Sequence, residues 1–287
     1  MNEQKLANVT TDESLSSYAL DFIESIKTTG YKIRNSDRFR IMSMVSGSSY
    51  YQKRIANASL QTGSSQNFKL LPLVTPEYEA LQELYRKRNS IRTFKKTPLN
   101  FRELCTLLKL SYDITDEHQV PRDGIFDELE KIPKRNIPSA GGLYPIEMYF
   151  INSRVSGIPV GIFHYSVQEQ TLKLINSLSK KDIRENVFDI ICPSQKAMID
   201  CDSSSGFLVL AAHVNRSSFK YGDLGLKFAL IESGAILQSV AVACSLTGIG
   251  CCPIGAFLDD KLNHLLGLNS RDQISVLPIV IGRHDRG

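Results

Sequence analysis

The pattern of hydrophobic and polar positions divides the chain near residue 72. Residues 1–72 are polar and rich in Ser, Thr, Asn and Gln, with one helix predicted around Tyr18 to Ile26. Residues 73–287 carry regular apolar patterns. We therefore expect an N-terminal arm, residues 1–72, that packs on the core or on a partner, followed by one folded domain, residues 73–287.

Two helices are predicted at the start of this domain. Thr75 followed by Pro76 is a typical helix N-terminus, and apolar residues then recur at helical spacing up to a basic end. The second helix begins at Asn100, where Glu103 completes a capping box. We expect its apolar stripe to point inward; the stripe consists of Phe101, Leu104, Leu107 and Leu108.

The rest of the domain mixes strands with helices. Gln119 to Asn136 is polar and charged, which predicts a surface loop or lid. Predicted strands are Ile146 to Ile151, Gly157 to Tyr165, Thr171 to Ile175, Gly206 to Val214 and Ile274 to Ile281; predicted helices are Lys180 to Ile191, Leu226 to Leu246 and a short one from Asp259. The helix from Leu226 is apolar on most of its circumference, so we expect it in a core or a subunit interface.

Composition narrows the class of protein. The 287 residues are 42% hydrophobic, enough to bury a substantial core, and the 34 basic and 30 acidic residues form no long block of one sign, which argues against a nucleic-acid binder. The N-terminus lacks a secretory pattern, and the longest apolar segment contains Glu232 and Gln238, so we expect a buried helix, no membrane span and a cytoplasmic protein.

Cysteine and histidine spacing gives no metal signal. The six cysteines contain no C-x-x-C pair and the five histidines form no H-E-x-x-H motif. We expect reduced, mostly buried thiols and no metal site.

Lys220 and Tyr221 form the most informative pair of residues. A tyrosine has a pKa of about 10, and an adjacent ammonium stabilises its phenolate, so the pair could act as an acid/base catalyst. Either residue could be the proton acceptor. The alternative is a solvated surface pair.

Two further segments could bind a ligand. If the chain is extended there, Arg88, Ser90 and Arg92 share one side and could grip a phosphate and a ribityl chain; the alternative is a solvated basic helix end. Ser139, Ala140 and Gly141 lie in a small-residue turn that permits close approach to a flat ring. Gly248 and Gly250 follow a helix and fail the dinucleotide fingerprint, so an NAD-binding Rossmann domain is not expected.

Together these blocks resemble the FMN-dependent azoline dehydrogenases of the nitroreductase superfamily, the SagB type (McbC-like). The resemblance covers about residues 76 to 283 and is strongest in blocks 88–94, 138–149 and 218–255. It implies an α+β nitroreductase-like fold, with a central antiparallel or mixed sheet flanked by helices. It also implies a homodimer with FMN in two interface sites, with residues 73–287 as the FMN-binding domain.

The resemblance also assigns site residues. Lys220 and Tyr221 would match the catalytic pair. Cofactor contacts would come from Arg88, Ser90, Arg92, Ser139, Ala140, Gly141, Gln238, Gly255 and Arg283, with Arg283 near the phosphate. The chain departs from the family's pattern just after the pair, where Gly222 to Leu224 replace a more basic and aromatic stretch. This departure puts substrate recognition in doubt more than chemistry.

The implied activity is oxidation of thiazoline or oxazoline rings in a ribosomally made precursor peptide to thiazoles or oxazoles, as in antibiotic or bacteriocin biosynthesis. The implied partners are the peptide and the cyclodehydratase subunits of a larger synthetase complex. Two alternatives remain open. One is a general nitroreductase or NAD(P)H-dependent flavin oxidoreductase; the other is a flavin-binding structural subunit of a peptide-modifying complex.

Overall fold

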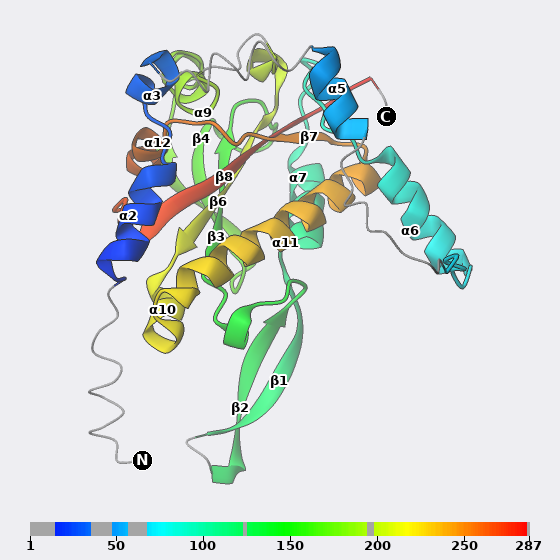
Figure 1. Ribbon diagram of the computed structural model, residues 1–287, viewed down its shortest axis with the longest axis vertical. Helices are drawn as coiled ribbons and strands as arrows, with labels where there is room; N and C mark the ends of the chain where they lie inside the picture. The colour runs from blue at the N-terminus through cyan, green and yellow to red at the C-terminus, as the bar shows by residue number, and fades with distance from the viewer. Residues whose placement is uncertain (1–14, 36–47, 57–67, 123–124, 194–197, 286–287) are drawn as a thin grey trace.

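The centre of the molecule is a six-stranded antiparallel sheet (Figure 1). The computed structural model describes residues 15–35, 48–56, 68–122, 125–193 and 198–285. The sheet has the order β5-β4-β3-β6-β8-β7. Its strands are β3 (Ile146–Asn152), β4 (Gly161–Ser166), β5 (Thr171–Ser177), β6 (Gly206–His213), β7 (Gly250–Pro253) and β8 (Gln273–Gly282). Helices and this sheet together confirm the predicted α+β class.

Helices cover both faces of the sheet. They are α2 (Ser17–Ile26), α3 (Gly30–Asn35), α5 (Ser49–Ala56), α6 (Pro76–Lys87), α7 (Phe101–Ser111), α8 (Lys180–Asp182), α9 (Phe188–Ile191), α10 (Asn215–Tyr221), α11 (Leu224–Thr247) and α12 (Asp259–Leu266). Side chains of β6 alternate between two cores: Leu208 and Leu210 face the core that contains α7 and α11, whereas Phe207 and Val209 face the core that contains α9 and α12. This double burial explains why β6 is almost continuously apolar.

The starts of α6 and α7 were predicted correctly. The Thr75 hydroxyl caps α6, and the reciprocal hydrogen bonds of Asn100 and Glu103 form the capping box of α7. Three members of the predicted α7 stripe are buried, but the prediction for Phe101 was wrong because its side chain is 38% exposed. Phe101 is the first residue of the helix, where the chain reaches the edge of the core beside Gly157.

The prediction of a loop at 119–136 was also wrong. Residues Ile114–Arg122 and Ile125–Arg135 form β1 and β2, an antiparallel hairpin that projects from the body (Figure 1). The side chains that the structure describes at the base of this hairpin are mostly exposed, and without a buried face its sequence lacks the alternation by which strands are recognised. Smaller differences are that β4 begins at Gly161, that β7 was not predicted, and that the helix over 180–191 contains a π-helical segment, Ile183–Val187.

The helix α11 crosses one face of the sheet and packs on β3, β6, β8 and α7. Nine of its residues are buried, but Lys227, Ile231, Gly234 and Gln238 form an exposed stripe at helical spacing. Within the described ranges it is the one helix long and apolar enough to cross a membrane. Its buried residues nonetheless contact the sheet, as expected for a core helix. All six cysteines are free, and five of them are buried.

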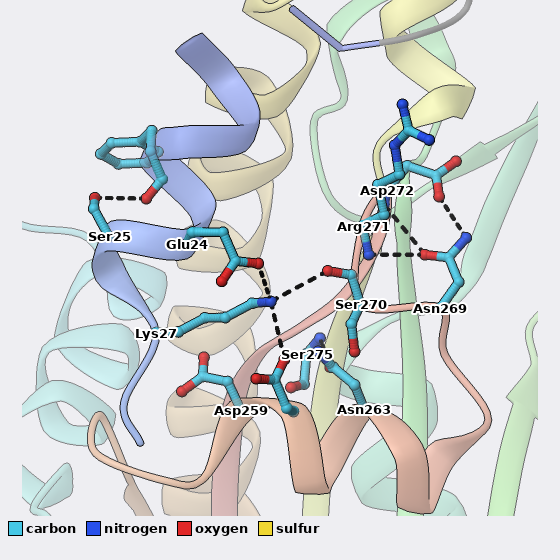
Figure 2. Close-up of polar contacts among 12 residues, drawn as sticks. Glu24, Ser25, Lys27, Asp259, Asn263, Asn269, Ser270, Arg271, Asp272 and Ser275 are labelled. Atoms are coloured by element: carbon cyan, nitrogen blue, oxygen red, sulfur yellow. Dashed lines mark hydrogen bonds and ion pairs between the residues drawn. The ribbon is translucent and has the colours of Figure 1, made fainter. Parts of the chain in front are cut away.

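The described part of the N-terminal region packs on the body through α2 (Figure 2). Lys27, only 7% exposed, forms ion pairs with Glu24 and with Asp260 at 2.9 Å. The Thr28 amide donates to Asp259 Oδ2 at 2.8 Å. The division into an arm and a domain at residue 72 stays a prediction.

This junction makes stability depend on pH. Burial raises the pKa of Asp259 from 3.8 to about 6. Between these values the folded state keeps a proton that the unfolded state has released, so stability should fall as the pH rises from about 4 to about 6 and then level off. Asp259→Asn keeps an acceptor for Thr28 and should remove this slope. Urea unfolding of both proteins across this pH range tests it, and parallel curves would contradict it.

Candidate active site

The fold brings the predicted ring-binding turn against the predicted catalytic pair. Ala140–Gly142 form one turn of 3-10 helix before β3, and the pair ends α10. A Cβ placed on Gly141 would lie 2.7 Å from Tyr221 Oη and 3.0 Å from Lys220 Nζ. A side chain at position 141 would push the ends of both side chains aside, and the φ of 64° also favours glycine there.

The pair itself has a defined geometry. Lys220 is exposed and Tyr221 is half-buried. The Tyr221 ring packs edge-on against Phe228 of α11, with centroids 5.0 Å apart, and Lys220 Nζ lies 5.1 Å from the Tyr221 centroid. Phe228 therefore fixes the phenol so that its hydroxyl faces the turn, with the Lys220 ammonium beside the same turn.

The turn is conformationally strained and held from several sides. Gly141, Gly142 and Tyr144 have φ values of 64°, 67° and 45°. Tyr144 donates its amide to Ser139 Oγ at 2.9 Å, and its hydroxyl accepts from the Arg135 amide at 2.9 Å. Its carbonyl accepts from Arg216 at 3.2 Å. A positive φ in a non-glycine residue costs about 1–3 kcal/mol and persists only where the surroundings enforce it.

A buried carboxylate, Glu232, lies behind the turn. It is 3% exposed, accepts a hydrogen bond from Tyr112 Oη at 3.3 Å, and interacts with the Ser139 side chain and the Ile146 backbone. Burial raises the pKa of Glu232, whereas these donors oppose the rise. Sequence reasoning missed this role, although a glutamate within an apolar helix was the available signal.

Arg135 completes this cluster. Its guanidinium lies between two tyrosine rings, 4.7 Å from the centroid of Tyr112 and 4.6 Å from that of Tyr144. Because Arg135 is the last residue of β2, the stack connects the projecting hairpin to the turn.

The predicted phosphate residues lie just after α6. Ser90 bridges to Cys251 of β7, and the Ile91 amide donates to the Cys251 carbonyl at 2.9 Å. Arg88 and Arg92 are exposed, and neither forms an ion pair with a carboxylate among the described residues. Two uncompensated guanidiniums beside a hydroxyl are a donor set that fits a phosphate group.

The other predicted cofactor residues are spread along the sheet edge and α11. The guanidinium of Arg283 pairs with both oxygens of Glu103, at 2.6 and 2.8 Å, so it is engaged by a carboxylate. Gln238 lies on the exposed stripe of α11. Gly255 follows β7, and a Cβ there would meet nothing within 4 Å, so the loop leaves space at this position.

The two groups of site residues do not meet within one chain. The turn and the Lys220–Tyr221 pair lie at the N-terminal end of α11. The Arg88 to Arg92 segment lies beside β7, at the C-terminal end of α11. The 24 residues of α11 span about 36 Å at 1.5 Å per residue.

The fold is α+β, with a basic segment after α6 and the Lys220–Tyr221 pair against a glycine-containing turn. A model of the Nitroreductase family matches residues 85–283, and the chain belongs to this family. It is 26% identical over 203 residues to a protein named as a nitroreductase from Methanocaldococcus jannaschii, covering 71% of this chain and 90% of that protein.

Solved structures share the fold. A chain of the Escherichia coli microcin synthetase McbBCD complex, solved with truncated pro-MccB17 bound, superposes with a TM-score of 0.62 at 14% identity, covering 99% of this chain and 98% of that one. A nitroreductase structure from Anabaena variabilis gives a TM-score of 0.57 at 23% identity over 74% of this chain. The present chain spans only 39% of the Anabaena chain.

Paired glycine substitutions test the contact between the turn and the pair. Gly141→Ala and Gly142→Ala both place a side chain at φ near +65°, which costs about 1–2 kcal/mol in each case. A Cβ at Gly142 meets nothing within 4 Å, so only Gly141→Ala should displace Tyr221. We expect Gly141→Ala to be the less stable variant, as measured by urea unfolding of both proteins. Equal stabilities would show that the contact is absent.

Proposed function

We propose that this nitroreductase-family protein is a cytoplasmic FMN-dependent azoline dehydrogenase of the SagB type. It would oxidise thiazoline or oxazoline rings of a ribosomally made precursor peptide to thiazoles or oxazoles. The observation that carries the proposal is the convergence of Lys220 and Tyr221 on Gly141. An azoline ring can be aligned for oxidation on a surface that is free of side chains and has a base beside it.

The full-length likeness to a chain of the microcin synthetase complex supports a peptide substrate. That complex was solved with a pro-peptide bound, and the match covers 99% of this chain. By the same likeness, we propose that the protein associates with cyclodehydratase subunits. An unstable azoline would then pass directly from one enzyme to the next.

We propose that the domain over residues 73–287 binds FMN. Arg88, Ser90 and Arg92 would hold the phosphate, and the Ser139–Gly141 turn and Gly255 would contact the ring system, with Gln238 on α11 as a further contact. FMN, when bound, accepts the hydride equivalent that leaves the substrate ring. The engagement of Arg283 by Glu103 limits its proposed role to the periphery of the phosphate site.

The separation of the two residue groups supports a homodimer. A cofactor much shorter than 36 Å cannot contact both ends of one α11, so each site would take its phosphate residues from one subunit and its catalytic pair from the other. The exposed stripe of α11, which includes Ile231 and Gly234, is a suitable interface because it is uncharged apart from Lys227.

The protein's chemical task is then to remove one proton. Tyr221, with Lys220 beside it, would take the proton from the ring carbon that was the amino-acid α-carbon, although the two side chains could exchange roles. The ring loses this proton and a hydride equivalent, which is two electrons in total, and becomes aromatic. Membership of the family also supports a second candidate function, that of a general NAD(P)H-dependent flavin oxidoreductase. In that case NAD(P)H would rapidly bleach the bound flavin.

Substitution of the pair tests the proposal. Tyr221→Phe and Lys220→Ala should keep the flavin spectrum and thermal stability but lower azoline oxidation by about 10² to 10⁴, the range for losing a general acid/base. Mass spectrometry measures the reaction, because each aromatised ring loses about 2 Da, the mass of two hydrogens. Flavin reduction by dithionite should be unchanged. Oxidation at the parent rate in both variants would remove the central support for the dehydrogenase.

Mixing two inactive variants tests the shared site. Arg88→Ala with Arg92→Ala should give mostly colourless protein, and Lys220→Ala with Tyr221→Phe should give yellow, inactive protein. If each site combines residues from two subunits, refolding them together at equal amounts makes about half of the dimers mixed, each with one intact site. About a quarter of the parent activity should return. No recovery, despite mixed dimers detected by native mass spectrometry, would place both groups in one chain.

A further inference from the structure

A polar cavity of about 410 Å³ lies at the base of the hairpin, beside the strained turn. Its walls come from β2, the turn, β3, the end of β4 and α10; the residues that matter here are Ile132, Tyr144, Glu147, His164, Gln168 and Arg216. None of these residues belongs to the predicted site. A cavity of this size accommodates one or two amino-acid residues.

The cavity lies next to the proposed catalytic pair, although the pair itself does not line it. Arg216 lines it, and Arg216 and Lys220 are four residues apart on α10, which puts them on one face of the helix about 6 Å apart along its axis. Gly142 also lines the cavity, while the adjacent Gly141 faces Tyr221. The cavity and the pair are therefore connected through Gly142 beside Gly141 and through Arg216 one turn before Lys220.

Two of the charged side chains that line the cavity, Glu147 and Arg216, neutralise each other. Glu147 accepts from Arg216 at 2.5 Å and contacts His164 at 2.7 Å, and these partners hold its pKa at about 2, so it stays ionised. Arg135 is stacked between tyrosines, and its charge opposes the rise that burial causes in the pKa of Glu232, which lies outside the lining. The lining is therefore not strongly charged.

The remaining surface suits a peptide. Gln168 and Ser166 offer both donors and acceptors, and Ile132 and Val167 offer apolar contact. An extended chain advances about 3.3 Å per residue, so the 6 Å offset corresponds to a residue about two positions from the ring. The surface combines hydrogen-bonding groups for backbone amides with space for a side chain.

We propose that this cavity binds the segment of the substrate peptide that flanks the reacting ring, in extended conformation and about two residues from it. The proposal rests on the proposed function for the identity of the peptide. It assigns recognition of the flank to the hairpin base and to β4, outside the residues that handle the ring and the cofactor.

Two substrates separate this role from catalysis. One is a thiazoline capped as acetyl and methylamide, without flanking residues; the other carries three residues on each side of the same ring.

Gln168→Trp and Ser166→Phe should fill the cavity from exposed or half-exposed positions. The matched control is Glu169→Trp, at a neighbouring exposed position outside the lining. We expect KM for the long peptide to rise about tenfold or more in the filled variants, equivalent to about 1.4 kcal/mol. The kcat values and the KM for the capped ring should not change.

Fluorescence anisotropy with a labelled, ring-free peptide of the same flanks gives a readout independent of turnover. Weaker peptide binding in the filled variants, but not in Glu169→Trp, supports the flank site. This holds even if the enzyme oxidises neither substrate, and in that case only the proposed function fails. Oxidation of both substrates with the parent KM in the filled variants overturns the flank site and leaves the function standing. An equal rise in KM for both substrates also overturns it, because the cavity would then serve the ring.

Discussion

The contacts of one buried carboxylate hold the candidate site together. Glu232, on the central helix, interacts with the end of α7 through Tyr112, with the turn through Ser139 and with the start of β3 through the Ile146 backbone. Three segments far apart in the sequence are thereby fixed to α11. An unsatisfied buried carboxylate is costly, so the cluster is stable only when all these donors are in place. The same requirement keeps the strained turn against Tyr221.

Much of the fold could be predicted from local patterns. Helix caps at Thr75 and Asn100, and the continuous apolar run of β6, have signals within a few residues, and each was located correctly. The hairpin was missed because recognition of a strand depends on one buried face. Phe101 was misplaced because periodicity gives the direction of a side chain but not the position where the core ends.

The site was predictable only in part. The residue types of Lys220, Tyr221 and Gly141 indicated chemistry, but their contact depends on how α10 meets the turn, and no local pattern encodes this. The clusters around Arg135 and Glu147 depend on contacts between strands, helices and the hairpin that are distant in sequence. Charged residues in such clusters look like ordinary surface residues until the fold places them side by side.

The length of helix α11 also constrains the candidate site. Its 24 residues fix both the spacing and the relative rotation of the turn at one end and the arginine segment at the other. One inserted residue would add about 1.5 Å and rotate one end by about 100° against the other. Glu232 and the exposed stripe would then no longer face their present neighbours together. A change in the length of α11 would therefore disturb both ends of the site at once.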